Sequence, residues 1–226
     1  MKRRTRWLPL VMLTIACGGG DQPAPAGDAM GDDPDIAPTA AAAAAPAALS
    51  VRLDRADANR ADYHVSTIPG GWEIQTGPHG IAWDPSQVVS GDFTLSATLT
   101  EVGAPPGHRE GLGLFFGGSD LEGPSQRYSY FLVRADGRYL IKRRLGEETP
   151  NVTDGWIEES AVHSATGAGD VTNALSVVRV GDLVHFAVNG TQVATLPTSE
   201  VDVDGIVGVR VSHNLQVRVE DWTVSR

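Results

Sequence analysis

One cysteine, Cys17, is present among the 226 residues of this chain, which excludes a disulfide framework and any metal site built from several cysteines. Positive charge is also scarce, because 18 lysines and arginines stand against 28 aspartates and glutamates, and the net charge is −10. An anionic protein repels phosphate backbones, so we expect no nucleic-acid partner. The chain is rich in glycine (26) and proline (14), too rich for a helix bundle.

The N-terminus has the features of an exported lipoprotein. Residues 1–16 combine four basic residues with a short apolar segment, which is typical of a secretory signal peptide and too short to span a bilayer permanently. The segment ends in Leu13-Thr-Ile-Ala-Cys17, which resembles the bacterial lipobox, where a small residue precedes the cysteine that is lipidated. We therefore predict lipidation of Cys17 and a membrane partner through the lipid. The alternative is an ordinary secreted protein whose cysteine lies near the cleavage site by chance.

This interpretation also predicts where the protein resides. A lipidated, exported chain is held in the cell envelope. Gly18 follows the cysteine, where aspartate is associated with retention in the inner membrane of enterobacteria. In a cell with two membranes, the outer one is therefore favoured.

Residues 17–49 have the composition of a linker. Alanine, proline, glycine and aspartate dominate this segment, and it contains no aromatic residue. Such a composition cannot bury a core, so we predict a disordered tether. The folded body is expected at residues 50–226.

From about Ser50 the sequence changes to short runs in which apolar and polar residues alternate. Residues 92–100 alternate throughout, with Phe93, Leu95 and Leu99 on one side. The dipeptides Asp136-Gly137 and Asn189-Gly190 predict type I′ hairpin turns. No apolar stripe with helical spacing is sustained, so the body is predicted to be all-β, an antiparallel β-sandwich.

Three stretches, at residues 91–97, 128–134 and 186–190, resemble the concanavalin A-like lectin/glucanase sandwiches of bacterial exported proteins. Their order and spacing, over roughly Tyr63–Arg226, are similar to those of the domain named for 3-keto-disaccharide hydrolases. The resemblance implies a jelly-roll architecture and, as one alternative, a glycoside-processing hydrolase. Its motifs are structural, and no catalytic residue of the family can be assigned to a position in this chain.

Strand alternation separates an inward from an outward face. If residues such as Phe93, Phe131 and Val209 point to the core, a mixed aromatic and basic set points away from it. Tyrosine rings stack on sugars and guanidinium groups donate paired hydrogen bonds, so this set is a candidate saccharide-binding face. The alternative is a solvated sheet face without a ligand. The candidate residues are Tyr128, Tyr130, Arg134, Lys142 and Arg210.

A second, smaller set could carry chemistry. Histidine titrates near neutral pH, so His108 and Glu110, two residues apart, could share a proton with a substrate, with Asp120 and His213 as further candidates. Solvated or capping roles are the alternative for all four. The remaining histidines, His79 among them, are assigned no chemistry.

Metal and cofactor signals are weak. Asp202 and Asp204 have the spaced carboxylates that calcium prefers, but two carboxylates are too few for a full coordination shell, and a solvated turn is the alternative. No other metal or cofactor is predicted. The paired glutamates of laminarinase-type glucanases, the nucleophile elbow and the phosphate loop are absent from the sequence.

The sequence therefore favours a lipid-anchored binding module for a saccharide or similar polar ligand. A glycoside-processing enzyme is the first alternative, and a structural or protein-interaction lipoprotein is the second.

Overall fold

The computed structural model describes residues 48–226, which include the whole predicted β-sandwich. The predicted signal peptide, Cys17 and most of the linker lie outside the described residues, so those predictions stay untested. Within residues 48–226, no helix is long and apolar enough to cross a membrane.

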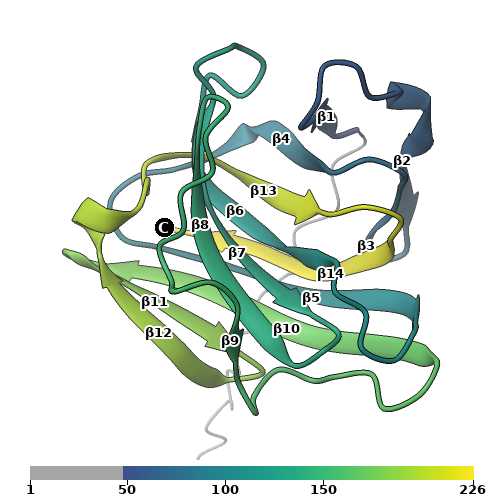
Figure 1. Cartoon of the computed structure of the whole chain (residues 1–226). Helices are drawn as coiled ribbons and strands as arrows, with labels where there is room; N and C mark the ends of the chain where they lie inside the picture. The colour runs from purple at the N-terminus through teal and green to yellow at the C-terminus, as the bar shows by residue number, and fades with distance from the viewer. Residues whose placement is uncertain (1–47) are drawn as a thin grey trace, which may run out of the picture. The chain divides into compact units, whose positions relative to one another are not determined.

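Two stacked antiparallel sheets make up the body, which confirms the predicted β-sandwich (Figure 1). The first sheet contains, in spatial order, β1 (Ser50–Leu53), β4 (Gly80–Val89), β13 (Gly205–Val211), β6 (Gly111–Ser119), β7 (Arg127–Arg134), β8 (Arg138–Leu145) and β9 (Ile157–Glu158). The second contains β12 (Thr191–Pro197), β11 (Leu183–Val188), β10 (Gly169–Val180), β5 (Phe93–Ala104), β14 (Gln216–Ser225), β3 (Gly71–Thr76) and β2 (Tyr63–Ile68). Two short 3₁₀ helices, η1 (Arg60–Asp62) and η2 (Thr198–Glu200), lie in connections.

The two predicted hairpins form, but with different turns. Asn189 and Gly190 both have positive φ, 50° and 79°, as a type I′ turn requires between β11 and β12. Between β7 and β8, Arg134 pairs with Arg138, so the loop has three residues rather than two. Only Gly137 in that loop has positive φ (81°), and its N–H donates to the carbonyl of Arg134. This is a three-residue hairpin, and the expected type I′ turn at Asp136-Gly137 is wrong.

The core lies between the sheets and is made by alternate residues of both. Phe93 and Val209 are 3% and 2% exposed, as the alternation predicts. Phe186 of the second sheet contacts Phe131 of the first, with ring centroids 5.3 Å apart. Full burial of each such side chain contributes about 2 to 3 kcal/mol, so this apolar layer is the main source of stability.

The outer face of the first sheet, the face turned away from the core, is also buried. A second apolar cluster there contains Phe115, Tyr128, Tyr130 and Leu132, with Leu121 from the loop after β6. Seven of the eight residues of β7 are buried, because the core covers one side of the strand and this cluster covers the other, and only Arg127 is exposed. The expectation that this face is open to solvent or ligand is wrong, because Leu121 and Trp156 from connecting segments pack against it.

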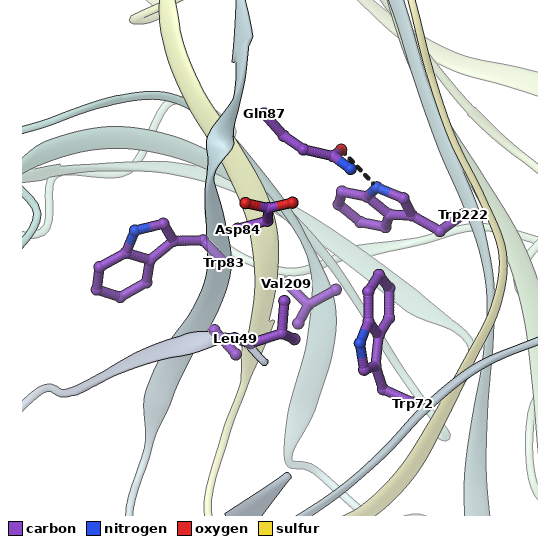
Figure 2. Close-up of a pocket in the computed structure, with 9 residues that line it drawn as sticks. Leu49, Trp72, Trp83, Asp84, Gln87, Val209 and Trp222 are labelled. Atoms are coloured by element: carbon purple, nitrogen blue, oxygen red, sulfur yellow. Dashed lines mark hydrogen bonds between the residues drawn. The ribbon is translucent and has the colours of Figure 1, made fainter. Parts of the chain in front are cut away.

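A small gap between the sheets is lined by Trp72 and Trp222 of the second sheet and by Leu49 and Val209 (Figure 2). The indole N–H of Trp222 donates to Gln87, 2.8 Å away. The free space is about 10 Å³, close to the least that holds one water molecule. This gap is therefore a packing feature and too small for an organic ligand.

Candidate functional site

An open cleft lies where the loop after β1 meets the end of β8. It consists of two adjoining hollows of about 580 and 670 Å³, which share Asp54, Arg55, Ala56, Arg144 and Glu147. Together the two hollows form the cleft. The larger hollow also reaches the two histidines that flank the first sheet at this edge, His79 and His213. Both signs of charge therefore line one concave surface.

A buried ion pair forms the floor of the cleft. Arg210 of β13 donates two hydrogen bonds to the carboxylate of Asp54, at 2.9 Å and 2.5 Å. Its guanidinium also donates to the hydroxyl of Tyr128 (2.8 Å) and lies 4.7 Å from the ring centroid of Tyr130. Arg144 approaches the same carboxylate to 3.9 Å. A buried cation needs such partners, because an unpaired charge in a low-dielectric interior is costly.

These contacts set the protonation states at the floor. Burial alone would raise the pKa of Asp54, but the charge and hydrogen bonds of Arg210, together with the charge of Arg144, lower it to about 2. Burial also raises the pKa of Tyr128 to about 12. At neutral pH Asp54 is therefore an anion and Tyr128 a neutral hydroxyl.

The five residues of the predicted saccharide face are not an open surface. Tyr128 and Tyr130 are 0% and 3% exposed and pack on each other with ring centroids 5.7 Å apart. Their rings are therefore not available to stack on a sugar in this conformation. Arg210 is the member of the set that reaches the cleft floor, through Asp54.

Arg134 and Lys142 also find partners within the chain. Arg134 donates to Asp136 and lies 4.2 Å from the ring centroid of Trp156. That indole packs directly on Gly111, so it fills the groove that the glycine would otherwise leave. Lys142 is half-buried and donates to Thr149, and its pKa is lowered first by burial and then by the charge of Arg210. Tyr128, Tyr130, Arg134 and Arg210 of the outer face thus form a covered polar and aromatic layer.

The histidine cluster, defined as His79, Glu110 and His213, lies at one end of three neighbouring strands. His79 precedes β4, Glu110 precedes β6, and His213 follows β13, which runs antiparallel between the other two. Antiparallel neighbours place the start of one strand beside the end of the next, so these three positions meet at one edge of the sheet. The topology therefore gathers residues that are far apart in the sequence.

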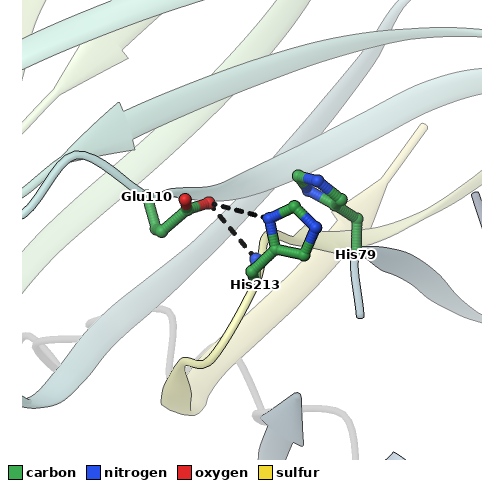
Figure 3. Close-up of side chains that lie close together, drawn as sticks. All are labelled: His79, Glu110 and His213. Carbon is green, nitrogen blue, oxygen red and sulfur yellow. Dashed lines mark hydrogen bonds and ion pairs between the residues drawn. The ribbon is translucent and has the colours of Figure 1, made fainter. Parts of the chain in front are cut away.

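The cluster is tight (Figure 3). The Nδ1 atom of His213 lies 3.6 Å from a carboxylate oxygen of Glu110, and the backbone N–H of His213 donates to that same oxygen at 3.3 Å. The two imidazole ring centroids are 3.2 Å apart. Burial, and then the neighbouring His213, lower the pKa of His79, which favours its neutral form.

The four predicted catalytic candidates are divided by the structure. Glu110 and His213 come together, whereas His108 lies 2.5 Å from Glu101 of β5. Burial raises the pKa of Glu101, and the hydrogen bond from His108 opposes that shift. Asp120 has a positive φ of 49° and accepts from the backbone N–H of Ser125, so it shapes its own loop.

The two candidate calcium ligands are occupied by arginines. Both carboxylate oxygens of Asp202 accept from Arg143, at 3.2 and 2.9 Å. Asp204 accepts from Arg179 at 2.7 Å. Within residues 48–226, neither belongs to a group of three side chains close enough to share a metal ion. Nothing in this arrangement favours calcium over structural ion pairs.

Sequence reasoning missed two residues of this region. Asp54 follows the short β1, and only its partner Arg210, 156 residues away, gives it a place in the cleft. His79 was assigned no chemistry because it lies in a turn-rich stretch, Gly77-Pro-His-Gly80. No local signal distinguishes either residue, since their roles arise from strand order.

Comparison with known proteins identifies similar folds among solved structures but no protein family. No protein-family model matches the chain. No curated protein matches it either. A solved structure, the carbohydrate-binding module CBM66 from Bacillus subtilis, aligns over 78% of this chain and 95% of that one, with a TM-score of 0.56 and 12% identity. This likeness supports the β-sandwich architecture.

Two further solved structures align less well. A Bacillus subtilis protein of unknown function with a galectin-like fold covers 78% of this chain and 88% of its own, at a TM-score of 0.47 and 14% identity. Sheep galectin-11 covers 70% of this chain and 100% of its own, at a TM-score of 0.42 and 11% identity.

Proposed function

We propose that this protein is an exported, lipid-anchored binding module that takes a saccharide in the cleft. The observation that carries the proposal is the cleft itself, a concave surface that presents carboxylate, guanidinium and imidazole groups together. Ligand sites are concave and use a few well-placed polar groups for orientation. The structural neighbour named as a carbohydrate-binding module supports the same class of ligand.

The chemistry of the cleft suits a polyhydroxylated ligand. A sugar hydroxyl both donates and accepts hydrogen bonds, so it needs acceptors such as Glu147 and donors such as Arg55 within one surface. The ion pair below holds Asp54 in place, so that its side chain is preorganised rather than mobile. Uncompensated acidic groups would repel an acidic sugar, but Arg55 and Arg144 offer it counter-charges.

Anchoring explains why a small binding module would be exported on a long linker. The segment between Cys17 and the body would act as a tether of roughly 30 Å root-mean-square span. A cysteine that carries more than one acyl chain gives stable attachment, whereas a single chain does not. Metabolic labelling with a radioactive or clickable fatty acid tests this part, because a Cys17→Ser variant should lose the label.

Direct binding is the test of the ligand. We would screen the full-length chain by calorimetry against neutral and acidic oligosaccharides and then compare two arginine variants. Arg55 lines the cleft and is exposed, so Arg55→Ala should weaken binding about tenfold, as loss of one charge-assisted hydrogen bond does. Arg138, also in an exposed ion pair but on β8 away from the cleft lining, is the matched control. Equal affinity of the two variants, or no binding to any saccharide, would refute the proposal.

A glycoside-processing hydrolase is the second candidate, and the contact between Glu110 and His213 favours it. Retaining hydrolysis needs a second carboxyl group about 5 Å from the first, with one of the pair protonated. Asp54 cannot supply that proton, because its pKa of about 2 keeps it ionised. The general acid would therefore have to come from the histidine cluster. Release of reducing sugar by the full-length chain, lost in His213→Ala, would favour this candidate.

A further inference from the structure

The histidine cluster has the composition of a metal site, and we propose that His79, Glu110 and His213 bind a divalent transition-metal ion of the zinc or cobalt type. This inference does not rest on the proposed saccharide binding, because it concerns the ion alone. Among residues 48–226, this is the one group of three such side chains that could hold an ion.

The distances are close to those of a coordinated ion. One potential ligand atom from each side chain lies within 4.8 Å of the other two. With metal–ligand bonds of about 2.1 Å, tetrahedral ligand atoms are roughly 3.4 Å apart. The 3.6 Å between His213 Nδ1 and the Glu110 oxygen already matches this spacing. The side chains of His213 and Glu110 are 43% and 34% exposed, so small rotations can bring the remaining atoms to bonding distance.

The surroundings of His79 provide a second, independent observation. Its Nδ1 atom is buried, and no described residue donates to it or accepts from it. A buried polar nitrogen without a partner costs free energy, and native proteins rarely leave one. Coordination of Nδ1 would give this nitrogen its partner.

The ligand set and the local charge select the class of ion. Two imidazoles and one carboxylate favour zinc, cobalt, nickel or copper over calcium and magnesium, which prefer oxygen ligands. Arg210 is the cation that acts on His79, and it is neutralised by its two hydrogen bonds to Asp54. Glu110 contributes a carboxylate to the cluster, and a carboxylate attracts a cation.

Three protein ligands would leave at least one coordination position open. His79 and His213 both line the larger hollow of the cleft, so the open position would face the cleft. An oxygen atom of a bound molecule or water could then complete the coordination. The ion would thus lie beside the floor formed by Asp54 and Arg210, and it would add a positively charged centre to the cleft.

Metal titration tests the proposal directly. The full-length chain would be freed of metal with a chelator and titrated with Zn²⁺ by calorimetry and with Co²⁺ by visible absorption. We expect one equivalent of each ion to bind and Co²⁺ to show d–d bands of a site with nitrogen and oxygen ligands. His79→Ala and His213→Ala should each weaken binding at least about 100-fold, since outer-shell changes alone cost up to that factor.

Matched variants separate this site from other donors. His64 lies exposed on β2, so His64→Ala should bind the ion as the parent chain does. Cys17→Ser should also leave the Co²⁺ spectrum unchanged, because the thiol is not a proposed ligand. Zn²⁺ should raise the midpoint of thermal unfolding in the parent chain and in His64→Ala, but not in His79→Ala. This stability readout also reports whether each variant is folded.

The binding measurements can either support the metal site or overturn it. Saturable binding of one equivalent that is lost in His79→Ala and His213→Ala supports the site. Absence of saturable binding, or equal affinity in His79→Ala, His213→Ala and His64→Ala, overturns it. Glu110→Gln distinguishes a three-ligand from a two-ligand site, because loss of the carboxylate should weaken Zn²⁺ binding while retaining the imidazoles. Unchanged affinity in that variant would contradict the ligand set proposed here.

Discussion

The two faces of the first sheet are both buried, but their chemistry differs. The inner face packs against the second sheet through apolar side chains such as Phe131 and Val209. The outer face combines aromatic rings with the buried guanidinium groups of Arg134, Arg144 and Arg210. Apolar packing is non-directional, whereas a buried cation must meet an acceptor of suitable geometry. The inner face therefore holds the fold together, and the outer face determines which side chains reach the cleft.

The largest effect is expected from a cavity on the inner face. Phe131 is fully buried and contacts Phe186 and Tyr139. Phe131→Ala should lower the free energy of unfolding by about 4 kcal/mol, through lost burial and the cavity left behind. Urea denaturation followed by tryptophan fluorescence measures this loss. A cost below about 1 kcal/mol would mean that the inner face is not the main stabilising layer.

A change on the outer face should act through charge rather than volume. Arg210→Met leaves the carboxylate of Asp54 largely buried without its partner, and we expect a loss of about 3 kcal/mol. Adding Asp54→Asn to Arg210→Met should recover part of that loss, since it removes the uncompensated charge. If the loss of unfolding free energy in the double variant equals the sum of the losses in the two single variants, Arg210 and Asp54 do not stabilise the fold as a pair.

Low pH should lower the free energy of unfolding through protonation of Asp54. The folded-state pKa of Asp54, about 2, is lower than its ordinary value of 3.8, so its ionised form stabilises the folded state. This contribution, about 2 kcal/mol, is fully present above about pH 4 and is lost as the pH falls through 3.8 toward 2. Unfolding free energies measured at pH 5 and pH 2.5 should therefore differ more in the parent chain than in Asp54→Asn. Identical pH dependence of the two chains would contradict this.

The smallest effect on stability is expected for Arg55, which lines the cleft. Arg55 and Asp57 form an exposed ion pair whose side chains are 74% and 69% exposed. Arg55→Ala should leave the unfolding free energy nearly unchanged, because such exposed pairs contribute little. The same variant is expected to weaken saccharide binding, so a large loss of stability would assign Arg55 to the fold rather than to the cleft.

The sequence alone determined the architecture, because the pleat of a strand makes side chains alternate and each sheet must bury one face. The inward set that contains Phe93 and Val209 was correct for this reason. The same alternation assigned Tyr128 and Arg210 to the outward side, but it could not tell that loops bury that side as well. Loop coverage depends on contacts such as that of Trp156 with Gly111, which have no periodic signature.

The assembly of the sites was decided only by tertiary structure. Glu110 and His213 carried a signal as individual residues, but their meeting with His79 follows from the position of β13 between β4 and β6. Asp54 had no signal until Arg210 was beside it. Alternation is a local property of the backbone and can be read along the chain, whereas strand order depends on long-range pairing that local residues do not encode. For this reason the sandwich was predictable, and the cleft and the histidine cluster were not.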